Sequence, residues 1–495
     1  MGQMQLNEEQ IRLIFGLKLK QIRSEKDLSL FGLSKLTGMS KSYLNEIEKG
    51  KKYPKPDKIV ALAEALDTTY EDMVNMKLTG NMAPLSDIIR SRILKEIPLE
   101  LFGIEESNLI DIIANAPDKV TAFIGTMFEI SRHYDVTRES FYLASLRSYQ
   151  ESHENYFADI EQEVKKFSKR YQVDLNRKIE SEYLEEILKV EFEYTIDYDT
   201  LSNGDYPDEI RSIFIPKEKK LLIAKSVSET QRVFILAKEL GYAHMKITQR
   251  PLTFTWIKFE HFEDVLNNFK ASYFAGALIL PEERLVNDIK AFFERKTWDP
   301  EAFLDIVFNY TDSAETFFQR LTNLLPKHFG IKQLFFLRFS YTDESPFPKL
   351  TKELHLSRIH QPHAIKNLEH YCLRWVSTDI LLNRKKYPVK DNIRVGAQHS
   401  KYLSGDEYLI LSASNSDPFI EGKSRSVCIG IELSTKQKKK INFCEDESVN
   451  TRLVGTTCER CAVENCDERA SKPTVLKTQL HNAEIEKQVY DLIGK

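Results

Sequence analysis

Two short helical patterns near the N-terminus meet at a single glycine, and this junction constrains the local fold more than any other feature of the sequence. In residues 33–50 apolar side chains recur every three or four positions, as on one face of a helix. Gly38 can adopt the left-handed conformation that a tight turn between helices requires, and Ser40 is placed to cap the next helix. The pattern predicts a helix-turn-helix whose helices are held together by Leu36, Leu44 and Ile47.

A helix-turn-helix can present the N-terminal end of its second helix to the major groove of DNA. Eleven Lys or Arg residues stand against five Asp or Glu between Lys18 and Lys58, which agrees with a basic face. A small helical bundle that binds protein is the alternative. The residues expected to contact double-stranded DNA are Ser40, Lys41, Ser42, Tyr43 and Asn45 on the helix, and Lys49, Lys51 and Lys52 beside the phosphates.

The first 75 residues or so resemble the lambda-repressor-like (XRE) helix-turn-helix family. The resemblance implies a sequence-specific DNA-binding domain. One position departs from the family pattern, because the Gln that is common early in the second helix of the family is Leu30 here. The phosphate contact made by that Gln is therefore not expected in this chain.

The length of 495 residues exceeds what one hydrophobic core holds, so several domains are expected. The patterns predict a multidomain α+β protein: a helix-turn-helix domain (1–78), a helical connector or dimerisation region (79–178), a mixed domain (179–330) and a β-rich sensor domain ending in a tail helix (331–495). No apolar run is long enough to cross a bilayer, and residues 1–10 lack the apolar core of a signal peptide. A cytoplasmic protein is expected.

The helix expected at residues 232–242 has the outline of a zinc-peptidase helix without its ligands. In a His-Glu-x-x-His motif, two His residues one turn apart bind zinc and the Glu acts as a base. Here the two ligand positions are Lys238 and Tyr242, and only Glu239 remains. The third ligand is expected at Asn268. His244 is turned away from that helix face, so neither zinc proteolysis nor any catalytic residue is expected.

Residues 180–290 resemble the IrrE/ImmA peptidase-like domain, through the segments 232–242 and 269–281. They are still more similar to the metal-free form of that domain in the short-chain fatty acyl transcription regulators. The apolar residues that both segments share are also expected to be core residues. These are Phe234, Leu236, Phe274 and Leu278.

All six cysteines lie in the last quarter of the chain, and three of them fall within nine residues. Cys458, Cys461 and Cys466 have the spacing of a metal clip, which in a reducing compartment is more expected than a disulfide framework. A fourth ligand, from Cys444 or Cys372, would complete a zinc site, and an iron-sulfur cluster is the other possibility. Three reduced thiols without metal are the alternative. Cys428 lies in an apolar strand pattern and is expected in the core.

The segments 457–461 and 466–470 resemble the C-terminal signature of the same acyl regulators, which control propionate and glyoxylate metabolism, and 371–375 resembles another of their segments. The resemblance implies an acyl-coenzyme A effector and, in some members, a [4Fe-4S] cluster. It assigns the ligand role to Cys458, Cys461 and Cys466, and a secondary one to Cys372.

Two further segments could hold a ligand. Residues 148–157 are rich in polar and aromatic groups, although buried, hydrogen-bonded His153 and Asn155 are the simpler expectation. The basic run 436–440 is expected to be a solvated turn. The sequence as a whole predicts a dimeric or tetrameric transcription regulator that senses a small metabolite. A regulatory metallopeptidase of the IrrE/ImmA type and a phage-type or antitoxin-like repressor are the alternatives.

Overall fold

The structure is a computed structural model, and its chain divides into two compact units. One unit comprises Met1–Ser145 with Glu260–Phe262, and the other comprises Leu146–Phe259 with Glu263–Lys495. Most of the predicted connector lies outside the described residues. The structure describes residues 8–75, 138–204, 206, 210–251, 261–356, 369–417 and 422–493.

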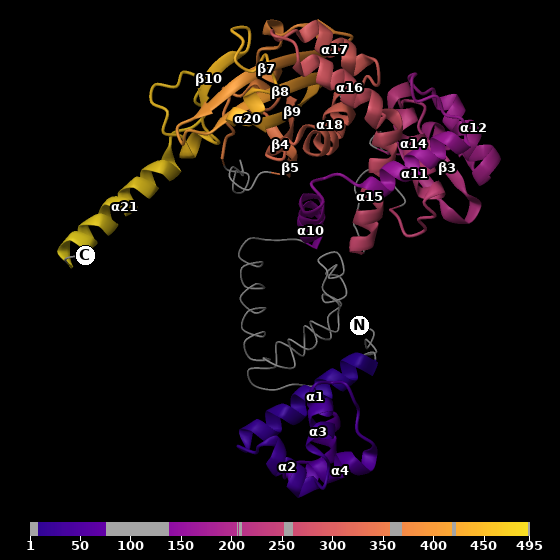
Figure 1. The fold of residues 1–495 in the computed structure, drawn as a ribbon, viewed down its shortest axis with the longest axis vertical. Coiled ribbons are helices and arrows are strands. Elements are labelled where there is room, and N and C mark those ends of the chain that lie inside the picture. Colours follow the sequence, from indigo (N-terminus) through magenta and orange to yellow (C-terminus); the bar gives the residue numbers. More distant parts are fainter. Residues whose placement is uncertain are drawn as a thin grey trace. The chain divides into compact units, whose positions relative to one another are not determined.

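The first unit begins with five helices around one small core (Figure 1). These are α1 (Glu8–Glu25), α2 (Leu30–Thr37), α3 (Lys41–Glu48), α4 (Pro56–Ala65) and α5 (Tyr70–Val74). Leu44 and Ile47 of α3 are fully buried, as predicted, and pack with Leu33 of α2. The prediction for Leu36 is wrong, because its side chain is 60% exposed. The face of α2 that meets α3 is the one that carries Leu33.

Two glycines permit α1 to approach α3 closely. A side chain at Gly16 would place its Cβ 2.2 Å from the carbonyl oxygen of Ile47, so any larger residue there would push the two helices apart. Gly50, just after α3, has a φ of 67°, which favours glycine, and its Cβ would lie 2.9 Å from Cα of Leu13. The position of α3 in the domain therefore depends on close contact between its backbone and that of α1.

The large unit begins with helices and a small sheet. The helices are α10 (Arg138–Ser152), which begins in the first unit and ends in the large one, α11 (Ala158–Arg170), α12 (Ser181–Phe192) and α13 (Thr200–Asn203). The sheet has the order β1-β3-β2, from β1 (Thr195–Asp197), β2 (Ser212–Ile215) and β3 (Lys220–Ile223). Three longer helices follow, α14 (Glu229–His244), α15 (Phe262–Ile279) and α16 (Glu282–Phe293). Apolar runs at residues 212–215 and 221–224 predict strands, and residues 229–243 and 267–279 predict helices. The structure confirms all four as β2, β3, α14 and α15.

The rest of the large unit is built on a seven-stranded sheet with the order β10-β7-β8-β9-β4-β5, in which β6 also pairs with β7. The strands are β4 (Leu334–Thr342), β5 (Lys349–His355), β6 (Val389–Lys390), β7 (Ile393–Tyr402), β8 (Glu407–Ser416), β9 (Lys423–Glu432) and β10 (Asn450–Val454). The accompanying helices are α17 (Pro300–Phe308), α18 (Ala314–Phe329), α19 (Val376–Leu382), α20 (Thr435–Lys438) and α21 (Thr474–Leu492). The apolar runs at residues 334–339, 408–411 and 427–431 predict strands, and the structure confirms them as parts of β4, β8 and β9.

The two faces of this sheet carry separate cores. One face packs, through Phe336 and Ile429, into a core that also includes α11, α14, α15 and α18. The other face packs against α19, with Trp375 and Cys428 among its buried residues. The prediction of a core position for Cys428 is confirmed, and burial raises the pKa of its thiol to about 12. The IrrE-like part and the β-rich part thus share one continuous core, to which the helix α11 also contributes.

A buried ion pair crosses this core and joins three helices. Nη1 and Nη2 of Arg320 on α18 donate to the carboxylate of Glu161 on α11 at 2.6 and 3.0 Å. The hydroxyl of Tyr273 on α15 donates to the same carboxylate at 2.8 Å. Arg320 Nε donates to the carbonyl oxygen of Leu280 at 3.0 Å. Both charges are therefore fully hydrogen-bonded, which is the condition under which a buried pair persists.

The tail helix α21 runs away from the seven-stranded sheet (Figure 1). None of its residues is buried, and Leu480, Ile485 and Val489 are largely exposed. The predicted tail helix is confirmed, but beyond its first turn its apolar side chains are exposed. No helix among the described residues has the length and apolar character to cross a membrane.

Candidate functional site

The turn between α2 and α3 has the predicted construction. Gly38 ends α2 in the left-handed conformation, with a φ of 67°. The hydroxyl oxygen of Ser40 accepts a hydrogen bond from the backbone N–H of Tyr43 at 3.2 Å and so caps α3. Because the side chain of Ser40 makes this cap, its expected contribution to DNA binding is to fix the start of α3.

The N-terminal end of α3 exposes the side chains predicted to contact DNA. Lys41, Ser42 and Asn45 are exposed, while Tyr43 is half-buried. Lys52 is held beside the same helix, because its ammonium lies 2.9 Å from the carboxylate of Glu46 and 5.8 Å from the Tyr43 ring centroid. The pair with Glu46 raises the pKa of Lys52. Of the two other predicted lysines, Lys51 is exposed and Lys49 is half-buried.

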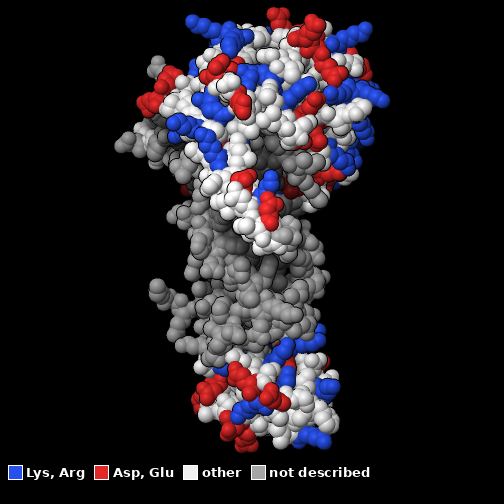
Figure 2. All heavy atoms as spheres, turned by 90° about the vertical axis from the view of Figure 1, so that its left-hand side faces the viewer, with Lys and Arg blue, Asp and Glu red and all other residues white. Residues whose placement is uncertain are grey.

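A bidentate ion pair fixes α3 against α1. Arg23 on α1 donates to Glu48 at 2.6 Å from Nε and at 3.0 Å from Nη2, and also donates to the carbonyl oxygen of Leu28 at 2.6 Å. Both side chains are mostly buried, and the hydrogen bond to Glu48 raises the pKa of Arg23. Planar bidentate pairing of this type fixes orientation as well as distance. On the face drawn in Figure 2, both basic and acidic side chains are present, which agrees with the nearly balanced net charge of −4.

The three positions corresponding to zinc ligands come together, as the sequence comparison of the helix at 232–242 implied. The ammonium of Lys238 donates to Oδ1 of Asn268 at 2.6 Å, and the hydroxyl of Tyr242 donates to the same oxygen at 3.3 Å. We call this cluster the lysine centre. Burial lowers the pKa of Lys238 to about 8. An ammonium, an amide and a phenol do not form a zinc site, whose ligands are imidazole, thiolate and carboxylate groups.

Glu239, at the position of the peptidase base, is paired with arginine. Its carboxylate lies 2.7 Å from Nη2 of Arg250, and both side chains are buried. The Arg250 guanidinium in turn lies 3.8 Å from the ring centroid of Phe214 and 4.2 Å from that of Tyr242. Burial raises the pKa of Glu239, and Arg250 acts against this shift. His244, as predicted, points elsewhere, with Nε2 3.1 Å from Glu163.

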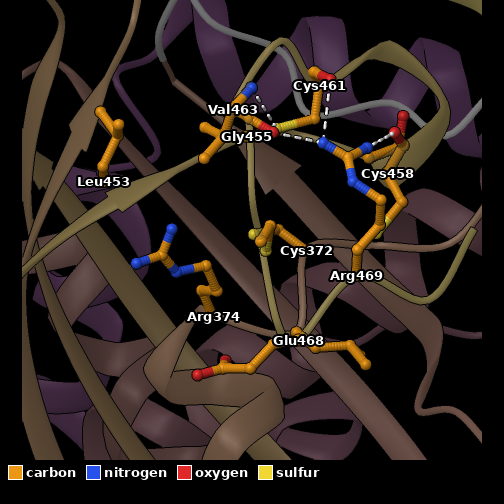
Figure 3. A pocket seen from close by; sticks show the side chains of 12 residues that line it. Cys372, Arg374, Leu453, Gly455, Cys458, Cys461, Val463, Glu468 and Arg469 are labelled. Atoms are coloured by element: carbon orange, nitrogen blue, oxygen red, sulfur yellow. Dashed lines mark hydrogen bonds between the residues drawn. The ribbon is translucent and has the colours of Figure 1, made fainter. Parts of the chain in front are cut away.

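The four cysteines at the end of the sheet line one small cavity of about 10 Å³ (Figure 3). Two chain segments bring them together. The backbone N–H of Cys372 donates to the carbonyl oxygen of Thr456 at 3.1 Å, and that of Cys458 donates to the carbonyl oxygen of His370 at 2.8 Å. The cavity is lined by Cys372, Leu373, Arg374, Leu453, Gly455, Thr457, Cys458, Cys461, Val463, Cys466, Glu468 and Arg469.

One arginine fixes the loop that carries these thiols. The guanidinium of Arg469 donates to the carbonyl oxygens of Cys458, Cys461 and Val463 at 2.8, 3.3 and 2.5 Å (Figure 3). Sγ of Cys461 also accepts a hydrogen bond from the backbone N–H of Val463 at 3.5 Å. A Cβ at Gly455 would lie 2.6 Å from the same sulfur, so glycine is needed where the loop passes.

The donor set of this cavity suits a thiolate-bound metal, although the thiols are not yet arranged around one. Among the described residues, no three His, Cys, Asp or Glu side chains are grouped so as to hold a metal ion. The space is that of about one water molecule, so an iron-sulfur cluster would require the loop to widen. Burial raises the pKa of Cys372 to about 11. Cys444 does not line the cavity and contacts the Lys438 carbonyl oxygen at 3.8 Å, which leaves Cys372 as the fourth thiol.

Sequence reasoning did not find the arginines of these sites. Arg469 falls inside the C-terminal signature, where only its cysteines were assigned a role, and nothing in the pattern around Arg250 marked it as a partner of Glu239.

For residues 148–157 the simpler expectation holds at Asn155, which is buried and donates to Thr322 at 2.8 Å. His153 is exposed, contrary to the expectation of burial.

Comparisons with known proteins agree with two of these regions. A helix-turn-helix family model matches residues 19–73, and an IrrE N-terminal-like domain model matches residues 199–298. A comparison with curated proteins finds no match. One similar solved structure is described as a Mycobacterium tuberculosis transcriptional regulator; it is 18% identical, covers 66% of this chain and 92% of its own, and has a TM-score of 0.48. The chain therefore combines an XRE-type helix-turn-helix, as found in DNA-binding regulators, with an IrrE-like domain and a β-rich C-terminal region.

Proposed function

We propose that this protein is a sequence-specific, cytoplasmic transcription regulator that binds a DNA operator with α3 and a short-chain acyl-coenzyme A with its large unit. The observation that carries the DNA part is the capped start of α3, where Lys41, Ser42 and Asn45 are exposed together. Asn45 would read a base edge, and the lysines would contact phosphates. Two copies of the chain would place two such helices on a symmetric operator.

The lysine centre argues against peptidase chemistry in the IrrE-like domain. Lys238, Tyr242 and Asn268 satisfy one another, and Glu239 is held by Arg250, so the side chains of a peptidase site are engaged in internal contacts. A ligand in this unit would change DNA binding only by preferring one arrangement of the two DNA-binding domains. We expect the acyl-coenzyme A to act in this way, in a homodimer or homotetramer.

The cysteine cavity would hold zinc or a [4Fe-4S] cluster through Cys458, Cys461 and Cys466, with Cys372 as the fourth thiol. A cluster would supply a redox-sensitive input, and zinc would supply a fixed cross-link. The backbone donors and Arg469 would orient the thiolates in either case. Full-length protein should contain stoichiometric iron or zinc, and replacement of Cys458, Cys461 and Cys466 by Ser should remove it. Replacement of Cys444 by Ser, as the control, should leave the metal content unchanged.

The metabolite is tested by thermal denaturation of the full chain with a series of acyl-coenzyme A species. A ligand that binds the folded state stabilises it by an amount that grows with the logarithm of its concentration over its Kd. Propionyl-coenzyme A or a short relative should raise the Tm. The absence of a Tm shift with any species would contradict acyl-coenzyme A as the effector and leave the DNA-binding proposal untouched.

The operator is found by selection of bound sequences from a random duplex library with the same protein.

The IrrE-like match favours one alternative, a regulatory metallopeptidase. Retention of metal after replacement of the three cysteines, together with proteolysis that a chelator abolishes, would support it. Loss of the metal in that variant without proteolysis in the parent chain would support the regulator.

A further inference from the structure

One face of the seven-stranded sheet changes from apolar to cationic along its strands. In the antiparallel pairing, Phe336 of β4 lies opposite Ile429 of β9 inside the core. Two residues further along β4, Arg338 lies opposite Lys352 of β5, and Ser340 lies opposite Arg425 of β9. Side chains of cross-strand partners point to the same face. The register therefore places Lys352 and Arg338 side by side, with Arg425 on the next strand and diagonal to Arg338, in a staggered row across three adjacent strands beside the core.

Two carboxylates pair with this row. Glu315, in the first turn of α18, lies 2.9 Å from Nη1 of Arg338 and 3.5 Å from Nζ of Lys352. Asp417, which follows β8, lies 2.5 Å from Nη2 of Arg425. These ion pairs hold the ends of the cationic side chains close to one another. They also show that the row is part of a folded network and not a set of independent surface charges.

We call Arg338, Lys352 and Arg425 the cationic row. Among the residues that the structure describes, the ion pairs of these three cations are with two carboxylates, those of Glu315 and Asp417. The row and its paired carboxylates therefore carry a positive surplus.

The cationic row adjoins the lysine centre and is open to solvent. The charge of Lys352 is close enough to Lys238 to lower the pKa of that buried lysine. The side chain of Lys352 is 45% exposed, and those of Arg338 and Arg425 are 26% and 28% exposed. A ligand can therefore reach the ends of these side chains without unfolding the unit. The row lies where the IrrE-like part meets the sheet.

We propose that the cationic row binds the phosphate groups of an organic phosphate. Half-buried cations in surplus repel one another, and a multiply charged anion removes this cost while accepting charge-assisted hydrogen bonds from the guanidinium groups. The inference rests on the proposed function, because in an acyl-coenzyme A the phosphates carry the negative charge and the acyl-pantetheine arm carries none. The row would then recognise the nucleotide end of the effector, and other parts of the unit would recognise the acyl group.

The proposal is tested by titration calorimetry on the full chain with five probes: propionyl-coenzyme A, coenzyme A, adenosine 3′,5′-bisphosphate, pantetheine and inorganic phosphate. The variants are Arg338→Gln and Lys352→Gln, and the matched control is Lys296→Gln, which removes an exposed lysine in the turn after α16. Each variant in the row should bind coenzyme A and the bisphosphate about tenfold more weakly, as expected for the loss of one charge-assisted hydrogen bond. The control should bind like the parent chain. Unchanged Tm values establish that the variants fold.

The outcomes separate this proposal from the proposed function. Parent-like affinity for coenzyme A in both row variants would overturn the cationic row and leave the effector in place. If the row variants bind the bisphosphate more weakly than the parent chain does, the row is supported. If the parent chain also binds coenzyme A as tightly as its acylated form, the acyl effector is overturned. Binding of pantetheine as tight as that of coenzyme A would overturn the row. Binding of inorganic phosphate alone would support an anion site without a nucleotide, and binding of no probe would overturn both proposals.

Discussion

The helix-turn-helix and the large unit place their charged residues in opposite ways. In the helix-turn-helix, Lys41, Lys51 and Lys52 of the proposed DNA-contacting surface are exposed, and one ion pair, Arg23 with Glu48, anchors α3 from the inner side. In the large unit, charged groups reach the interior, including Arg320 with Glu161, Arg250 with Glu239, and Lys238. The first domain is organised to meet a large polyanion at its surface, and the second is organised around internal charges.

This difference indicates which substitutions of charged residues each part tolerates. Exposed charges interact weakly and can change without affecting the fold, whereas buried charges are costly when their partner is removed. Substitutions in α3 should therefore alter DNA binding and spare stability. Substitutions among the buried charges of the large unit should alter stability first. The following predictions are ordered by the size of the expected effect.

Replacement of Arg320 by Met should lower the free energy of unfolding of the large unit by about 3–5 kcal/mol, because Glu161 is left buried without its partner. Tryptophan fluorescence in urea measures this unit selectively, since all three tryptophans lie between residues 256 and 375. The control is Arg295→Met, which removes the exposed partner of Asp299. A loss in Arg320→Met no larger than in the control would contradict the assigned importance of the buried pair.

Lys238 should make the stability of the large unit dependent on alkaline pH. Its pKa is about 8 in the fold against 10.5 in the unfolded chain, so between these values the unfolded chain binds more protons. The unfolding free energy should therefore rise as pH increases from 8 to 10.5, by about 3 kcal/mol from this group. Lys238→Met should lose this rise, while Lys436→Met, at an exposed site, should keep it. Parallel pH profiles of the unfolding free energy for the parent chain and Lys238→Met would show that the fold does not lower the pKa of Lys238.

Asn45→Ala should weaken operator binding by about 1–3 kcal/mol, with little change in affinity for an unrelated duplex. The exposed position of Asn45 predicts an unchanged Tm for the helix-turn-helix. Fluorescence anisotropy with both duplexes gives the ratio of the two affinities. Equal losses on both duplexes would remove Asn45 from base recognition.

Lys41→Ala should have the smallest effect, a loss of affinity that is the same for the operator and for unrelated DNA. Neutralisation of one fewer phosphate should reduce the slope of log K against log salt concentration by about 1. Measurement of both duplexes at several salt concentrations gives the slope. A loss confined to the operator would reassign Lys41 to base contact.

The elements could be predicted from the sequence wherever their signals are local. The glycine turn and serine cap predicted α3, and runs of apolar residues predicted β4, β8 and β9. The convergence of Lys238, Tyr242 and Asn268 was also implied, by helix spacing for the first two and by the resemblance to the peptidase-like domain for Asn268. The cationic row could not be found in this way, since its members lie on three strands whose register is set by strand pairing. Leu36 was misplaced because periodicity alone does not tell which of two apolar positions faces the partner helix.

The role of Arg469 has a consequence for how the cysteine cavity is filled. Because one guanidinium ties three carbonyl oxygens of the loop, the backbone path of the loop is fixed at three points. Part of the conformational entropy of the loop is therefore lost during folding. Any widening of the loop acts against these hydrogen bonds, so a single zinc ion, which needs less room than a cluster, should be taken up at the smaller cost in hydrogen bonding.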